Sequence, residues 1–362
     1  MHSRRIGMLI ALVMMWGAVA AQAAHTRVPS PAKLQRRAEA GIEKLQKWYV
    51  PSTGLYRTTG WWNSANALTM LADYSLAAHS SRYNAVLSNS FEQAQKTSAG
   101  FLNKFYDDEG WWALAWIAAY DLTHEQRYLD MAESIFADMA GGWDATCRGG
   151  IWWSKDRKYK NAIANELFLS VAAHLANRVA TADREKYLDW AEKEWRWFER
   201  SGMINHEYLI NDGLDAACRN NGETTWTYNQ GVILGGLAEL ARAPHAPQLL
   251  AHAKEIADAA MTRLSNSRGV LHDACEPKCG ADGVQFKGIF LRNLVTLNAI
   301  VPDERYGAFA MTNAESIWKH ARGPDNRFGQ VWAGPYDAAN AGTQSSALDA
   351  FVAALALAPR KH

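Results

Sequence analysis

Two adjacent carboxylates, Asp107 and Asp108, are the residues of this sequence best suited to chemistry, and they lie in the segment YDDEGWW at 106–112. Hydrolysis of a glycosidic bond uses two carboxyl groups: one attacks the anomeric carbon or activates water, and the other protonates the leaving oxygen. Neighbouring carboxylates disfavour double ionisation, so one of them keeps a proton beside an ionised partner. We expect the pair to lie where a loop meets a helix, because a residue that is not yet helical lets the side chains reach the roughly 5 to 5.5 Å separation of a retaining enzyme. Taken alone, the pair also fits a structural role, with one Asp capping the helix and the other favouring its dipole.

Aromatic, amide and acidic residues recur where other predicted helices begin. Flat aromatic rings stack on the C–H faces of a sugar, while amides and carboxylates between them bind its hydroxyl groups. Helix capping explains a single Asn or Asp at such a position, but it does not explain paired tryptophans beside amides. The candidate substrate-binding residues are Trp62, Asn66, Trp111, Trp112, Asn165, Asp212, Tyr228, Asn229, Gln230 and Lys287.

Some of these candidates have a structural alternative. Asp212 precedes a glycine and equally fits an Asp-Gly turn. Lys287 precedes an apolar run and is either a substrate contact or a surface lysine with a buried stem. For Trp62, Asn66, Trp111 and Trp112 the alternative to sugar binding is packing at the rim of the fold.

Tryptophan is unusually frequent, with 16 in the chain. Its indole N–H needs a partner when it is buried, so many tryptophans indicate an aromatic core, an aromatic cleft or both. We expect both, with the cleft share surrounding the two aspartates. The tryptophans expected at the cleft are Trp61, Trp62, Trp111, Trp112, Trp152, Trp153, Trp226 and Trp332.

After its first 23 residues the chain is expected to be helical, because apolar residues recur at intervals of three and four rather than two. The spacing predicts helices near 31–48, 63–78, 84–103, 110–122, 125–140, 161–179, 183–200, 227–242, 246–265, 285–299, 304–321 and 341–358. The odd-numbered helices of this series are amphipathic, whereas several even-numbered ones are apolar nearly all round and must be buried. Alternating outer and inner helices predict an all-α (α/α)6 toroid, in which the inner helices begin on one rim.

Composition excludes several function classes. Lys plus Arg is 38 and Asp plus Glu is 37, a balance that does not favour nucleic acid as a partner. None of the 11 histidines falls in the rim segments, which argues against sugar epimerases and isomerases that use histidine bases. We expect no metal and no cofactor.

The first residues predict export. Arg4 and Arg5 precede an apolar run that is short for a membrane span, and Ala21-Gln22-Ala23 fits a cleavage site. We expect a signal peptide at 1–23, with an uncleaved anchor as the alternative, and a single domain at 24–362. No later segment is apolar and long enough to span a membrane, and the location is periplasmic or extracellular.

The four cysteines fit disulfides in an exported protein. Cys275 and Cys279 are close enough for a local bridge, which leaves Cys147 and Cys218 to pair. Zinc is the alternative, but two cysteines with three residues between them and no nearby histidine pair are a poor zinc signature.

These segments together resemble glycoside hydrolase family 76, the α-1,6-mannanases. Besides YDDEGWWALAWIAAYDLT, the stretches GGIWWS, KNAIANELF, TYNQGVILGGLAEL and FKGIFLRNL are similar to that family in the same order, over nearly the whole mature chain. The resemblance implies an (α/α)6 barrel, a retaining double displacement, endo-cleavage of α-1,6-linked mannan and no metal. It also implies that Asp107 is the nucleophile, that Asp108 is the acid/base, and that an Asp in the place of Asp212 contacts sugar hydroxyls.

The sequence therefore predicts an exported, monomeric, retaining endo-α-1,6-mannanase with a polysaccharide substrate. A transglycosylase remains open, because it uses the same covalent intermediate and differs only in the acceptor. A non-catalytic mannan-binding protein is a further alternative, against which the intact aspartate pair argues. The last alternative is a glycosidase of different specificity on the same fold.

Overall fold

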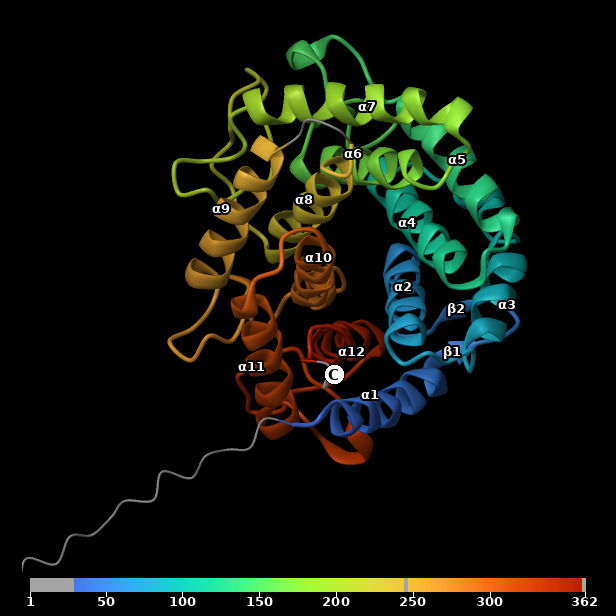
Figure 1. The fold of residues 1–362 in the computed structure, drawn as a ribbon, viewed down its shortest axis with the longest axis vertical. Helices are drawn as coiled ribbons and strands as arrows, with labels where there is room; N and C mark the ends of the chain where they lie inside the picture. Colours follow the sequence, from blue (N-terminus) through green and yellow to red (C-terminus); the bar gives the residue numbers. More distant parts are fainter. Residues whose placement is uncertain (1–28, 244–246, 360–362) are drawn as a thin grey trace, which may run out of the picture.

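The computed structural model describes residues 29–243 and 247–359, so the predicted signal peptide at 1–23 lies outside the described residues. Twelve α-helices, five short 3-10 helices and one short hairpin make up the regular structure of this part (Figure 1). The helices are α1 (Pro31–Leu45), α2 (Trp61–Ala77), α3 (Asn84–Ala94), α4 (Tyr106–Thr123), α5 (Gln126–Ala140), α6 (Ala162–Ala176), α7 (Thr181–Arg200), α8 (Thr227–Leu240), α9 (Pro247–Arg263), α10 (Phe286–Ile300), α11 (Glu304–His320) and α12 (Ala341–Ala356). The hairpin pairs β1 (Tyr49–Val50) with β2 (Leu55–Tyr56) in antiparallel register.

The even-numbered helices form a closed inner ring, and the odd-numbered ones wrap around it (Figure 1). Each inner helix packs against the next, and α12 closes the ring by packing against α2. The predicted (α/α)6 toroid is confirmed, and each of the twelve predicted helices corresponds to one of these elements.

The two kinds of helix follow from their apolar patterns. In α6 nearly every residue is buried, because neighbouring inner helices flank it and α5 and α7 cover its outer face. In α7 the buried side chains include Tyr187, Ala191, Trp195 and Phe198, at spacings of four, four and three, while the opposite face carries charge. A one-sided stripe suits the outer layer, and an all-round apolar surface suits the inner one.

Close packing within the ring depends on a glycine. A Cβ at Gly231 of α8 would lie 2.5 Å from the Cα of Phe290 in α10, a separation that no side chain tolerates. Glycine here lets the two backbones approach each other, which fixes the position of the first turn of α8.

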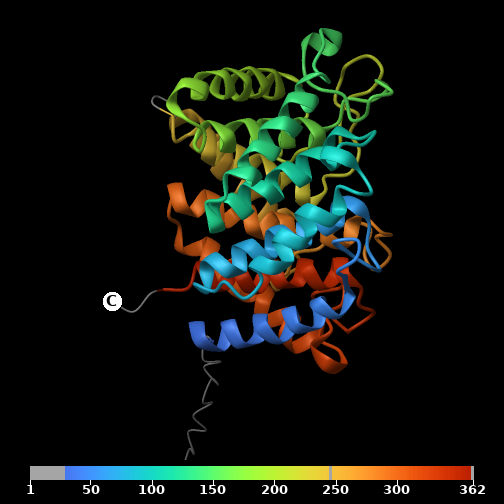
Figure 2. The same cartoon turned by 90° about the vertical axis from the view of Figure 1, so that its right-hand side faces the viewer.

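The connections differ at the two ends of the barrel. Long loops lead into the inner helices, whereas short turns leave them, as between α4 and α5. Figure 2 shows the long loops gathered at one end, with the end of α12 at the other. The long-loop end therefore has the chain needed to build a site around the starts of the inner helices.

Two disulfides tie these long loops, and both predicted pairings are confirmed. Cys147, after α5, pairs with Cys218, between α7 and α8, and Cys275 pairs with Cys279 in the loop before α10. Within the described residues, no helix combines the length and apolar character that a bilayer crossing requires.

Candidate active site

A cavity of about 570 Å³ opens at the end of the barrel where the inner helices begin. Its lining includes the first turns of α2, α4, α8 and α10 and the loops that lead to them. Six of the candidate catalytic and substrate-binding residues line it: Trp62, Asp107, Asp108, Trp111, Asp212 and Tyr228.

The aspartate pair lies inside the first turn of α4, not at a non-helical junction as the sequence analysis expects. The helix begins at Tyr106, whose backbone N–H donates to the carbonyl of Trp153 at 2.9 Å. Carboxylates in a first turn are favoured by the exposed N–H groups and dipole of the helix, which explains why the helical conformation extends through both residues.

The two carboxylates have different partners. Trp153 Nε1 donates to Asp107 Oδ2 at 3.0 Å, while Asp107 Oδ1 is buried and has no hydrogen-bond partner among the described residues. Asn103 Nδ2 donates to Asp108 Oδ2 at 2.6 Å. One oxygen of the pair is therefore desolvated and free to interact with a ligand.

Burial raises both pKa values of the pair. It raises the pKa of Asp107 to about 8, with the charge of Asp108 adding to the increase and the Trp153 hydrogen bond opposing it. Burial raises the pKa of Asp108 to about 6, against the hydrogen bond from Asn103. Both shifts favour retention of a proton within the pair, which acid-assisted glycoside cleavage requires.

Four aromatic rings form the floor of the cavity. Trp62 stacks on Trp111 with centroids 5.6 Å apart, Trp111 on Tyr228 at 6.4 Å, and Tyr228 on Phe286 at 3.8 Å. The angles between successive planes are 22°, 23° and 13°, so the rings form one gently turning row across four inner helices. Such a row offers flat apolar faces beside the carboxylates.

Two further carboxylates line the cavity, Asp212 and Asp282. Tyr159 donates to Asp212 Oδ2 at 2.6 Å, and the adjacent Gly213 forms an antiparallel bridge with Asn161. Asp212 thus belongs to a bridged segment that points its carboxylate into the cavity. Among the described lining residues there is no Lys, Arg or His, so the cavity is acidic.

Several lining residues were not predicted from the sequence, most importantly Asp282. Trp62 Nε1 donates to Asp282 Oδ1 at 3.1 Å, which joins the α2 side of the cavity to the loop before α10. The sequence feature that could have identified Asp282 is the pair Asp282-Gly283 just before a predicted inner helix. Other lining residues outside the prediction are Phe105, Tyr159, Asn161, Cys275, Cys279, Gly283 and Phe286.

Asn165 and Gln230 do not reach the cavity, contrary to the prediction, because both are fully buried and hold loop backbone. Asn165 accepts from the N–H of Ile151 at 2.7 Å and donates to its carbonyl at 3.0 Å. Gln230 makes the same pair of bonds to Ile210, at 2.8 and 3.0 Å. Each of these side-chain amides bonds to both backbone groups of one loop residue, and we call this arrangement an amide clamp. Amide clamps satisfy buried backbone groups, which explains why amides recur near the starts of inner helices.

Lys287 is also misassigned by the sequence analysis, since neither a substrate contact nor a surface lysine describes it. Its side chain is buried, forms an ion pair with Glu276, and donates to the carbonyl of Gln330 at 2.7 Å. Its Nζ also lies 4.7 Å from the ring centroid of Trp332. A buried charge with these partners braces the loop before α10.

Trp112, Asn66 and Asn229 also lie outside the cavity lining. Trp112 is fully buried and packs between Phe101 and Trp116 in the core. Asn66 lies deeper in the barrel, where it bonds to Arg292. Asn229 is fully buried, and neither of its side-chain polar atoms has a partner among the described residues.

The predicted cleft tryptophans divide into two groups by their position in the structure. Those that line the cavity are Trp62, Trp111, Trp153 and Trp226. Those that pack elsewhere are Trp61, Trp112, Trp152 and Trp332. Within the part of the chain that the structure describes, no cluster of three or more His, Cys, Asp or Glu is arranged to hold a metal ion.

A toroid of paired helices with a carboxylate pair on an aromatic floor defines a glycoside hydrolase. The family model for glycosyl hydrolase family 76 matches residues 33–361, and the chain belongs to that family.

Relatives and solved structures agree with this assignment. The chain is 28% identical to mannan endo-1,6-alpha-mannosidase DCW1 of Saccharomyces cerevisiae over 337 residues, which cover 82% of this chain and 72% of the relative. It is 27% identical to the DFG5 enzyme of Candida albicans, over 83% of this chain and 73% of the relative. The GH76A α-1,6-mannanase of Salegentibacter sp. HEL1_6 superposes with a TM-score of 0.79 at 25% identity, over 90% of this chain and 99% of that one. Dfg5 of Chaetomium thermophilum, at 21% identity, shares the fold with a TM-score of 0.81 over 92% of each chain.

Proposed function

We propose that this protein is a retaining endo-α-1,6-mannanase that cleaves mannan with Asp107 and Asp108. The observation that carries the proposal is the buried carboxylate pair beside the aromatic row, in a chain of family 76. Relatives named as mannan endo-1,6-alpha-mannosidases support the linkage. A structural neighbour complexed with α-1,6-mannotetrose is described as inactive after replacement of two consecutive aspartates, which supports the role of the pair.

In the proposed mechanism, Asp107 attacks the anomeric carbon while Asp108 protonates the leaving oxygen. A covalent glycosyl-enzyme forms, and Asp108 then removes a proton from the water that hydrolyses it. This chemistry needs a proton on Asp108 when the glycosidic bond breaks. Burial favours the proton on Asp107 in the free cavity, so the bound glycan must shift it to Asp108 or the two roles are exchanged.

Sugar rings would stack on the row formed by Trp62, Trp111 and Tyr228, with Asp212 accepting hydrogen bonds from hydroxyl groups. No step of a double displacement needs a metal or a cofactor. The acidic lining favours an uncharged glycan over one bearing phosphate, because like charges repel in a poorly solvated cavity.

We also propose that the mature protein is exported as a single monomeric domain. Two disulfides fit an oxidising compartment such as a periplasm or the exterior. The closed inner ring completes its own core, so the fold needs no second subunit.

The decisive experiment incubates linear α-1,6-mannan with the wild type, Asp107→Asn and Asp108→Asn. Asp130→Asn is the matched control, because Asp130 is exposed on α5 and bonds only to Gln126. We expect short manno-oligosaccharides from the wild type and the control, and none from the other two variants. Binding without release in the wild type would refute catalysis, equal cleavage of α-1,2 or α-1,3 linkages would refute the specificity, and product growth would identify a transglycosylase.

A further inference from the structure

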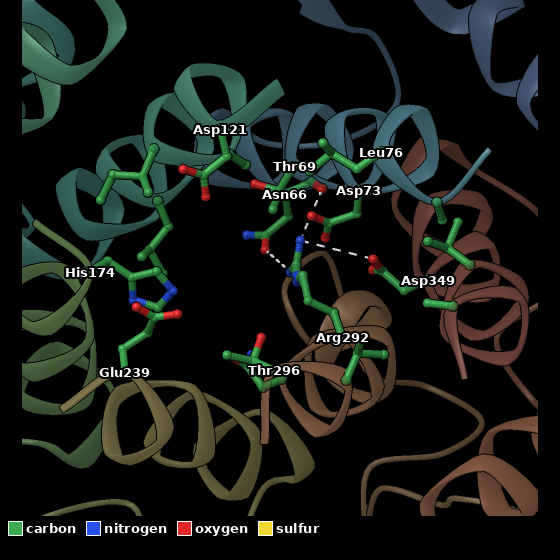
Figure 3. A pocket seen from close by; sticks show the side chains of 18 of the residues that line it. Asn66, Thr69, Asp73, Leu76, Asp121, His174, Glu239, Arg292, Thr296 and Asp349 are labelled. Carbon is green, nitrogen blue, oxygen red and sulfur yellow. Dashed lines mark hydrogen bonds and ion pairs between the residues drawn. The ribbon is translucent and has the colours of Figure 1, made fainter. Parts of the chain in front are cut away.

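A second cavity, of about 390 Å³, lies inside the barrel toward the end where the inner helices finish (Figure 3). Residues of all six inner helices line it, down to Ala77 at the end of α2 and Ala356 at the end of α12. Trp111 lines both this cavity and the candidate active site, so the two cavities are neighbours. We call the second one the axial cavity.

Two groups of charged side chains face each other across the axial cavity. On one side Arg178 pairs with Asp121 through two contacts of 2.7 Å and with Glu239 at 3.1 Å. Arg242 also contacts Glu239 at 3.3 Å, so two guanidinium groups balance the two carboxylates, and Asn177 donates a hydrogen bond to Glu239. This group is complete and leaves no unpaired charge.

The other group is incomplete. It consists of Asp73 of α2, Arg292 of α10 and Asp349 of α12, and Figure 3 shows both carboxylates directed toward Arg292. Arg292, however, bonds to the side chain of Asn66 and approaches Asp349 only to 3.9 Å. Two carboxylates therefore share one guanidinium that is already engaged elsewhere.

Asp349 is the clearest sign of a missing partner. Its side chain is 3% exposed and lines the cavity, and Oδ1 has no hydrogen-bond partner among the described residues. Burial raises the pKa of Asp349 to about 7 and that of Asp73 to about 6, with Arg292 opposing the increase in both cases. Above these values the cavity holds an uncompensated negative charge, which a low-dielectric interior disfavours unless a cation pairs with it.

The rest of the lining limits the chemistry of that cation. Leu76, Ile117, Val295 and Val352 provide aliphatic walls. Within the described residues no cluster of three or more metal-ligating side chains exists, which does not favour a divalent metal. A primary ammonium has three donors and pairs with two carboxylates, and an alkyl chain attached to it matches the apolar walls.

We propose that the axial cavity binds a small aliphatic amine, whose ammonium group lies between Asp73 and Asp349 and whose alkyl chain extends along Leu76 toward the rim. Leu76 is 42% exposed and lines the cavity, so it marks the route of entry. The site is separate from the aspartate pair, and its existence does not depend on the proposed mannanase activity. Ligand binding there would stabilise the closure of the ring, because α2, α10 and α12 each contribute a charged group.

Calorimetric titration with n-butylammonium chloride at pH 8 tests this proposal, with 1-butanol as the neutral analogue. We expect saturable binding of the amine to the wild type, no binding of the alcohol, and at least tenfold weaker binding of the amine to Asp349→Asn. Asp73→Asn should weaken binding similarly. Leu76→Trp should block entry while both carboxylates remain, and Asp130→Asn should bind like the wild type.

Four results would overturn the proposal. They are the absence of saturable heat with the amine, equal binding of 1-butanol, undiminished binding to Asp349→Asn, and occupation of the site by potassium or magnesium chloride in preference to the amine. If Asp349→Asn does not fold, the Leu76→Trp and Asp73→Asn titrations decide the outcome. A thermal denaturation series gives a second readout, since a ligand specific for the native state raises Tm with its concentration.

Discussion

The hydrogen bond from Trp153 to Asp107 gives a quantitative test of the carboxylate pair. If only the singly protonated pair is active, kcat/KM should have a bell-shaped pH profile with limbs near pH 6 and pH 8, set by the pKa values of Asp108 and Asp107. The Trp153 bond stabilises the ionised form of Asp107 and therefore lowers its pKa. Trp153→Phe removes the donor, so the alkaline limb should move to higher pH while the acidic limb stays in place.

The size of this shift follows from the geometry. A hydrogen bond to an ionised group contributes about 1.5–3 kcal/mol, and about 1.4 kcal/mol corresponds to one pH unit. Trp153 is 37% exposed, so water replaces part of the lost bond and the lower end of that range applies. We expect the alkaline limb to rise by about one pH unit.

The assay measures kcat/KM on α-1,6-manno-oligosaccharides between pH 4 and 10. Trp152→Phe is the matched control, because Trp152 Nε1 donates to Asp144 instead of the pair. Its profile should keep the wild-type limbs. An unmoved alkaline limb in Trp153→Phe, or one that falls to lower pH, would refute the assignment of this bond and of the raised pKa of Asp107.

Three further predictions test the roles of single side chains. Azide should rescue the activity of the small variants Asp107→Gly and Asp108→Gly. The variant that lacks the nucleophile should yield the inverted β-mannosyl azide and the one that lacks the acid/base the retained α-mannosyl azide, so NMR of the products shows which aspartate has which role. Asn165→Leu should lower the free energy of unfolding, measured in urea, by about 2–4 kcal/mol and leave KM nearly unchanged, because it leaves the buried N–H and carbonyl of Ile151 unsatisfied. A raised KM at unchanged stability would contradict this structural role of Asn165. Trp62→Ala should raise KM about two- to tenfold through lost stacking, at a nearly unchanged Tm, and an unaltered KM would remove Trp62 from the binding surface.

Much of the fold could be predicted because each helix carries its own apolar period. The local sequence makes α6 apolar all round and α7 apolar on one side only. This contrast predicts that α6 belongs to the inner layer and α7 to the outer one. The disulfides followed from the count and spacing of the cysteines. The aspartate pair could be recognised because it needs only two adjacent residues, although its helical conformation was not expected.

The orientation of neighbouring side chains could not be predicted. Trp111 and Trp112 are consecutive, but an α-helix turns by about 100° per residue, so one lines the cavity and the other packs in the core. Asn165 and Gln230 are amides near the starts of inner helices, and only the paths of the loops around them decide that they clamp backbone instead of binding sugar.

The sequence by itself determined the helical periodicity, the cysteine pairing and the chemical character of the carboxylate pair, because these depend on residues close together in the chain. Only the tertiary structure decided which rings share the cavity floor and which acids lie unpaired at depth. Asp73 and Asp349 come from opposite ends of the chain and meet because α12 closes the ring against α2. Contacts of that kind depend on how the ring closes, and no local pattern encodes them.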